Sequence, residues 1–181
     1  QHPAFNKLFI GSEYVPELGL QVFSRRPRSS KETSLLMGHM LVGNNSVLDV
    51  RHEADRRAFI GRGHGSRDPQ ALLSKEYLTG SSGATLDPVF ALGCEIAIAP
   101  HEDTQFAFLT FAAESREELI ALAEKFQTWP LIERTFHQAD INSQAQLERE
   151  GMNDAMLKDT LKTLSALIYP YKDVRAEAGI L

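Results

Sequence analysis

The spacing of apolar residues changes once along this chain of 181 residues, and the change limits the folds that it can adopt. Up to about Ala113, β-branched and aromatic residues form short runs separated by Gly, Pro, Asn and Ser, a pattern typical of strands joined by turns. Beyond Ala113, apolar residues recur with the 3.6-residue period of an amphipathic helix. The sequence therefore predicts an α+β fold, with an antiparallel β-sandwich over residues 1–113 and linker α-helices over residues 114–181.

Eight short segments carry the strand pattern, at residues 8–10, 20–24, 36–42, 46–52, 57–60, 89–92, 95–99 and 105–112. Between two of them, Gly43-Asn44-Asn45 supplies residues that tolerate the positive φ of a tight turn, which predicts a hairpin there. The polar segment at residues 100–104 predicts a second hairpin, between 95–99 and 105–112. Both faces of the last strand are apolar, as expected inside a sandwich.

Three helices are predicted in the second half. Ser115 and Glu118 have the spacing of a capping box, and Pro130 is expected to end the first helix. Gly151 is expected to end the second helix, and Asn153 to cap the third. The third helix carries an apolar stripe that requires a partner surface, and Pro170 is expected to end it. The stripe consists of Leu157, Leu161, Leu164 and Ile168.

Composition excludes several classes of protein. The net charge of −5 argues against nucleic-acid binding, which depends on concentrated Lys and Arg. No apolar run approaches the roughly 18 residues of a membrane span, so we expect no membrane contact. Cys94 is the single cysteine and is expected to be buried. Because it cannot form an internal disulfide, nothing indicates an oxidising compartment, and we expect a cytoplasmic location for this piece, with attachment of the parent to the inner membrane through other regions as an open alternative.

No sequence motif indicates catalysis. His52 and Glu53 begin like a zinc-protease helix, but Arg56 stands where the second histidine is needed. Glu102 and Asp103 are neighbouring carboxylates in a predicted turn, where water would keep both ionised. We therefore predict no catalytic residue, no metal and no cofactor in this chain. Trp129 is interpreted as a packing residue between helices rather than a platform for a sugar ring.

One loop offers the best local candidates for substrate contact. Arg62, His64, Arg67 and Asp68 lie within seven residues of one another, and their side chains could meet sugar hydroxyls or phosphate. The glycines of this loop do not precede a Lys-Ser/Thr pair, so they indicate unusual backbone angles rather than a nucleotide-binding loop. Arg67 and Asp68 could equally hold the loop in shape.

Longer phrases resemble a known family. The combined pattern is similar to that of cyclic β-1,2-glucan synthases, in the segment ahead of their C-terminal catalytic barrel, which is itself similar to glycoside phosphorylases. The phrases are HPAFNKLFI at 2–10, EYVPEL at 13–18, RPRS at 26–29, ADRRAFIGRG at 54–63, RDP at 67–69 and GATLDPVF at 83–90.

The resemblance implies an antiparallel supersandwich that leads through linker helices to an (α/α)6 barrel. The chain is then expected to be a piece of a longer protein, lacking the early strands and the barrel with its catalytic carboxylate. The resemblance implies a non-catalytic, carbohydrate-associated module of a parent glycosyltransferase or glycoside phosphorylase. Expected partners are the barrel, a β-glucan oligosaccharide and a second copy of the chain. The alternative is a free-standing carbohydrate-binding or assembly domain.

Overall fold

The computed structural model describes residues 9–27, 29, 31–44, 49–73 and 78–169. The chain forms two compact units, Gln1–Ile132 and Glu133–Leu181. The first unit holds the sheets and the helix α4, and the second holds most of α5 together with α6. The predicted α+β class with antiparallel sheets is confirmed.

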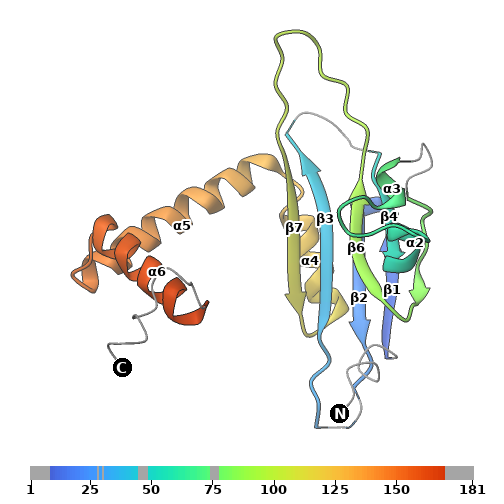
Figure 1. Ribbon diagram of the computed structural model, residues 1–181, viewed down its shortest axis with the longest axis horizontal. Coiled ribbons are helices and arrows are strands. Elements are labelled where there is room, and N and C mark those ends of the chain that lie inside the picture. The colour runs from blue at the N-terminus through green and yellow to red at the C-terminus, as the bar shows by residue number, and fades with distance from the viewer. Residues whose placement is uncertain (1–8, 28, 30, 45–48, 74–77, 170–181) are drawn as a thin grey trace, which may run out of the picture. The chain divides into compact units, whose positions relative to one another are not determined.

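The larger sheet has five strands in the order β5-β1-β2-β3-β7, and each neighbouring pair is antiparallel (Figure 1). A separate two-stranded sheet is formed by β4 and β6, also antiparallel. The bounds of the strands are β1 Ile10–Val15, β2 Leu20–Arg25, β3 Leu36–Gly43, β4 Arg51–Asp55, β5 Gly83–Ala84, β6 Pro88–Gly93 and β7 Phe106–Ala113.

One face of the five-stranded sheet packs against α4, Arg116–Lys125. Gly38 lets the helix approach, because a Cβ there would lie 3.1 Å from Cδ1 of Leu20 and 3.3 Å from the methyl groups of Leu119. Burial of a side chain such as Leu119 contributes about 1.5–3 kcal/mol. This core consists of Leu20, Val22, Met40, Val42, Ala113, Leu119, Ala123 and Ile132, and Trp129 packs against its edge as predicted.

The two-stranded sheet covers part of the opposite face. Phe23 of β2 meets Phe90 of β6 edge to face, with ring centroids 4.6 Å apart. Farther along the same face the aromatic side chains of β7 remain open, since Phe106 and Phe108 are each 51% exposed. The sandwich is thus closed over β2 and open over β7.

Two strand predictions were wrong. Residues 57–60 belong to the helix α2, Arg56–Ile60, because the carboxylate of Asp55 accepts a hydrogen bond from the Arg57 N–H at 2.8 Å and caps it. Residues 95–99 are not in a strand. The predicted hairpin around residues 100–104 is therefore absent; β6 pairs with β4, and β7 pairs with β3.

The hairpin predicted at Gly43-Asn44-Asn45 is also not formed as expected. Within the described strands, β3 pairs with β2 and β7 whereas β4 pairs with β6. Asn45 and the beginning of the predicted strand 46–52 lie outside the described residues. The sequence also did not predict the 3-10 helix η1, Pro16–Leu18, or the short helix α3, Gln70–Leu73.

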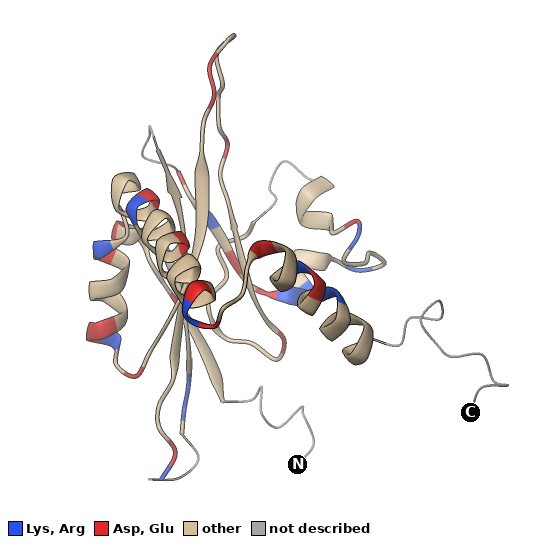
Figure 2. Ribbon diagram, turned by 90° about the vertical axis from the view of Figure 1, so that its left-hand side faces the viewer, with Lys and Arg blue, Asp and Glu red and all other residues tan. Residues whose placement is uncertain are grey.

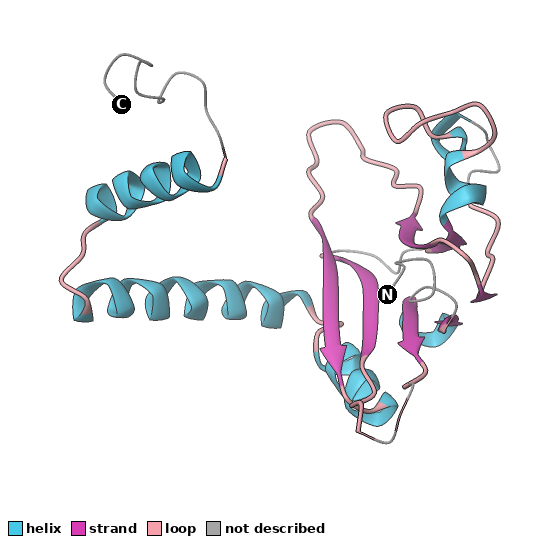
Figure 3. Cartoon of the chain, turned by 60° about the horizontal axis from the view of Figure 1, so that its bottom comes forward, coloured by secondary structure: helices cyan, strands magenta, loops and turns pink. Residues whose placement is uncertain are grey.

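Most of the predicted helix ends agree with the structure. Ser115 caps α4 by accepting from the Glu118 N–H at 3.2 Å, and Asn153 caps α6, Asp154–Ile168, by accepting from the Met156 N–H at 3.0 Å. Gly151 follows α5, Trp129–Arg149, with a φ of 65°. Figure 3 shows a short loop between the last two helices of the chain. Pro130 is different: it lies in the first turn of α5, where its missing N–H costs nothing, while α4 has already ended at Lys125. Pro170 lies outside the described residues.

The second unit leaves much of its apolar surface open. Leu161, Leu164 and Ile168 of the predicted stripe are 53%, 48% and 61% exposed. Acidic and basic residues are interspersed along α4 and α5 rather than gathered into one basic face (Figure 2). Among the described helices, none combines the length and the apolar character needed to cross a membrane.

Candidate functional site

The four predicted contact residues share one exposed loop between α2 and α3, and two of them interact. Oδ1 of Asp68 accepts a hydrogen bond from the Gly65 N–H at 3.0 Å, and its Oδ2 lies 3.5 Å from Nδ1 of His64. Asp68 therefore shapes the loop. Gly61 and Gly63 have φ angles of 81° and 82°, as expected for a loop with unusual backbone angles.

The two arginines of the loop have a different environment. Arg62 and Arg67 are exposed, and within the described residues neither guanidinium group has a hydrogen bond or an ion pair. Both are therefore free to meet a ligand from solvent. Their role in substrate contact stays a prediction.

Glu53 is a buried carboxylate that sequence reasoning did not single out as a structural centre. Its side chain is 1% exposed. Oε1 accepts from the Asp55 N–H at 2.9 Å and from the Ser81 hydroxyl, and Oε2 accepts from the N–H and the hydroxyl of Thr79 at 3.3 and 2.5 Å. Because four donors occupy the two oxygens, this carboxylate holds the segment after α3 onto β4 and is not available for acid-base chemistry.

Tyr14 and His52 stack beside this centre, with ring centroids 3.8 Å apart and planes 14° from parallel. The Tyr14 hydroxyl donates to the carbonyl oxygen of Val50 at 2.9 Å. Burial, and then the negative charge of Asp49, raise the pKa of Tyr14 above its ordinary value. Burial also lowers the pKa of His52, partly offset by Glu53, so the imidazole is neutral at pH 7.

A groove opens next to Tyr14, between the β1–β2 turn and the end of β3, with a cavity volume of about 560 Å³. It combines apolar and polar side chains from several segments of the first unit. It is lined by Tyr14, Pro16, Glu17, Leu18, Gly19, Met40, Leu41, Val42, Gly43, Asp49, Val50 and Gln127.

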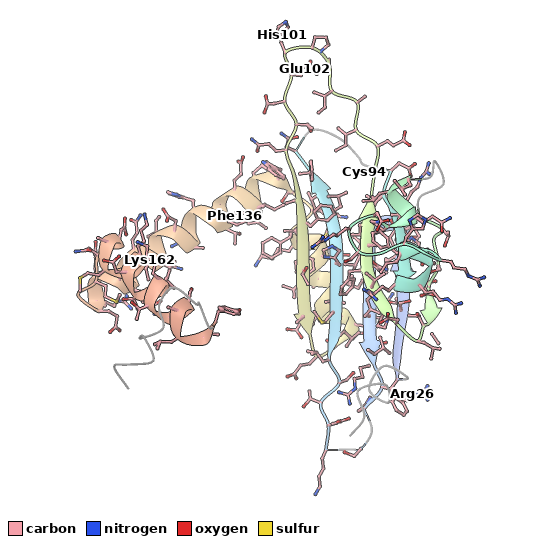
Figure 4. The ribbon with its side chains drawn as sticks, viewed as in Figure 1. Arg26, Cys94, His101, Glu102, Phe136 and Lys162 are labelled. Carbon is pink, nitrogen blue, oxygen red and sulfur yellow. The ribbon has the colours of Figure 1, made fainter. Side chains whose placement is uncertain are left out.

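The remaining predicted positions lie elsewhere. His101 and Glu102 are at the tip of the long β6–β7 loop, where Glu102 and Asp103 are exposed, as predicted (Figure 4). Cys94 lies at the base of that loop and is only partly buried, which corrects the expectation of a core cysteine; this burial raises the pKa of its thiol. Within the described residues, no group of three or more His, Cys, Asp or Glu side chains is arranged to hold a metal ion.

Comparison with known families identifies the fold unit. Residues 1–129 match the model of the glycosyl hydrolase 94 supersandwich domain. The chain belongs to this family. The match ends at the first residue of α5, so it covers both sheets and α4. The resemblance inferred from short phrases is thus confirmed, and the two sheets described above are part of a glycosyl hydrolase 94 supersandwich.

The supersandwich chain is also similar to a protein named cyclic beta-(1,2)-glucan synthase NdvB, from Rhizobium meliloti (strain 1021). The two are 26% identical over 178 residues, which is 98% of this chain. The chain spans only 6% of the length of that relative. The similarity therefore extends through the helices α5 and α6, beyond the supersandwich match.

Sequence reasoning missed the groove of this supersandwich domain for a definable reason. Its walls come from the β1–β2 turn, the end of β3, the residues before β4 and the residue Gln127 after α4. These segments are far apart in the sequence, so no short motif contains residues from two of them. The one local signal is Pro16-Glu17-Leu18-Gly19, which has the composition of a tight turn.

Proposed function

We propose that this chain is the non-catalytic sandwich and linker module of a protein that synthesises or phosphorolyses β-glucans. The observation that carries the proposal is the supersandwich match over residues 1–129. The relative named as a cyclic beta-(1,2)-glucan synthase supports β-1,2-glucan as the polymer. The module then serves as a scaffold and contact surface for chemistry performed by another part of the parent protein.

Three carboxylates considered as candidates, those of Glu53, Glu102 and Asp103, support the non-catalytic part of the proposal. Cleavage or transfer at a glycosidic bond generally uses a pair of carboxyl groups about 5–9.5 Å apart, one of them with a raised pKa. Glu53 is saturated by four hydrogen-bond donors, and Glu102 and Asp103 are exposed on a loop. Neither arrangement supplies a buried acid facing open space.

Exposed apolar surface supports a role in assembly. In the proposed parent, the supersandwich and the linker helices adjoin an (α/α)6 catalytic barrel. The half-exposed rings of Phe106 and Phe108 and the exposed stripe of α6 are the surfaces available for such contacts. A homodimer is the second arrangement that would cover the same kind of surface.

A free-standing carbohydrate-binding or assembly domain is the second candidate function. The closed core between α4 and the five-stranded sheet favours it, because a domain with its own core can fold alone. The coding sequence downstream of Leu181 separates the two candidates. A continuous reading frame that encodes a helical barrel with a catalytic carboxylate supports the module; a stop codon directly after Leu181 contradicts it and leaves the free-standing domain.

A further inference from the structure

The groove beside Tyr14 has the size of a ligand site. Its volume of about 560 Å³ lies within the range of about 300–1,000 Å³ that is typical of small-molecule pockets. Met40, Leu41 and Val42 of its lining are buried, at 1%, 6% and 6% exposed. The apolar side chains of the lining that solvent reaches are those of Pro16, which is exposed, and of Leu18 and Val50, which are partly exposed; these can take the C–H face of a ligand.

The rim of the groove is polar and carries only negative charge. Glu17, Asp49 and Gln127 line it and are exposed. No Lys, Arg or His is among the lining residues. Carboxylates accept hydrogen bonds and repel anions, while the amide of Gln127 can both donate and accept. This set of groups suits a neutral molecule with many hydroxyl groups and disfavours phosphate or a sugar phosphate.

The walls are held in place before any ligand arrives. The hydroxyl of Tyr14 donates to the Val50 carbonyl oxygen at 2.9 Å, and its ring is fixed against His52. Gly19 turns the chain with a φ of 58°, and a Cβ at this position would lie 3.8 Å from Cγ2 of Val50. A pre-formed wall reduces the ordering cost of binding.

We propose that this groove binds a neutral saccharide. Sugar hydroxyls donate to the carboxylates of Glu17 and Asp49 and exchange hydrogen bonds with the amide of Gln127, while a ring face lies against the accessible apolar side chains of Pro16, Leu18 and Val50. The choice of a β-glucan rather than another neutral saccharide rests on the proposed function. The preference for a neutral saccharide itself rests only on the charge and shape of the groove. The site is separate in sequence from the loop of Arg62 and Arg67, which would suit anions.

The test uses the full chain and a linear β-1,2-linked gluco-oligosaccharide, with binding followed by calorimetry and by amide shifts in NMR spectra. Asp49→Asn keeps the side-chain shape but removes the charge, and we expect it to weaken binding about tenfold. Gln127→Ala should weaken it about threefold. Glu102→Gln makes the same carboxylate-to-amide change on the exposed β6–β7 loop and should leave affinity unchanged.

The outcomes separate this inference from the proposed function. Amide shifts at Tyr14, Gly19 and Gln127, lost in Asp49→Asn, support the groove. Unchanged affinity in both groove variants, or no binding by the unaltered chain, overturns the groove proposal. Neither result affects the proposal that the chain is a non-catalytic module, because that proposal is tested by the downstream reading frame and by the turnover assay. Inorganic phosphate that shifts the same amides would also contradict the charge argument. If Asp49→Asn does not fold, the affinity of Gln127→Ala tests the groove proposal instead, because Gln127 is exposed and its substitution should not disturb the fold.

Discussion

Gln21 and Glu53 join the two sheets of the supersandwich through a buried hydrogen bond, in which Nε2 of Gln21 donates to the backbone carbonyl oxygen of Glu53 at 2.8 Å. Both side chains are at most 1% exposed. Oε1 of Gln21 also accepts from the Ala91 N–H at 3.2 Å, so one amide side chain connects β2 to both β4 and β6. Polar residues at such positions fix one arrangement of the layers, because any shift leaves buried groups unpaired.

We predict that Gln21→Ala lowers the free energy of unfolding by about 2–3 kcal/mol, because the N–H of Ala91 and the carbonyl oxygen of Glu53 lose a buried partner. Urea denaturation followed by circular dichroism measures this. Gln105→Ala removes an exposed glutamine side chain and should change stability by less than about 0.5 kcal/mol. Equal effects of the two substitutions would show that the amide is not a structural link.

A second prediction concerns the close approach of α4 to the sheet. Gly38→Ala adds a Cβ 3.1–3.3 Å from Leu20 and Leu119, and this overpacking should cost about 1–3 kcal/mol of unfolding free energy. Gly11→Ala lies in β1 of the same sheet, where an added Cβ meets nothing within 4 Å. It should be neutral or slightly stabilising. Thermal unfolding of the pair gives the comparison, and a destabilised Gly11→Ala with an unaffected Gly38→Ala would refute the packing account.

Stability should fall as the pH is lowered from about 7 to 5. Burial lowers the pKa of His39, which lies between the rings of Phe90 and Phe108, and burial also lowers that of His52. A histidine whose folded pKa lies below its unfolded value of about 6.5 binds its proton first in the unfolded chain. Acidification therefore favours unfolding, starting near that value. His39→Gln should flatten the dependence of unfolding free energy on pH over this window; an unchanged slope would contradict it.

The loop arginines give a prediction in the full-length parent. Arg62→Ala and Arg67→Ala should each weaken substrate use without lowering the melting temperature, because both side chains are exposed. Asp68→Ala is the structural comparison, since it removes the hydrogen bond to the Gly65 N–H and should loosen the loop. Steady-state kinetics that are unchanged in both arginine variants would leave the loop with a structural role alone.

The exposed stripe of α6 predicts self-association or docking. Leu161→Asp places a charge on this apolar face and should abolish a dimer of the chain or lower its melting temperature, since a buried charge without a partner is costly. Light scattering after size-exclusion chromatography measures the size. Lys158→Asp changes a polar neighbour on the same helix and serves as the control. If Leu161→Asp alters neither size nor melting temperature, α6 has no partner in this chain.

Local signals allowed much of the second half to be predicted from sequence. The Ser115 and Asn153 caps act within three residues, so their geometry is encoded in adjacent positions. Strand pairing is different, because it joins distant segments: β7 pairs with β3 rather than with its neighbour in sequence. The alternation of Ile96 and Ile98 indicated a strand, but a pattern of side chains does not supply a backbone partner.

The candidate sites show the same contrast. Arg62, His64, Arg67 and Asp68 were predicted together because they share one loop, and within it His64 and Asp68 do interact. Donors to the Glu53 carboxylate come from Thr79 and Ser81, more than 25 residues later in the chain. The sequence therefore does not indicate that hydrogen bonds occupy both oxygens of this carboxylate. Family phrases carried the identification instead, because they sample many positions at once.

The most direct test of the central proposal is the turnover of β-glucans by this chain. The purified chain is incubated with β-1,2-linked gluco-oligosaccharides and with cellobiose, each with and without inorganic phosphate, and the products are measured by anion-exchange chromatography. A non-catalytic module predicts no product above the control without protein. Product formation that a single substitution in this chain abolishes would contradict the proposal.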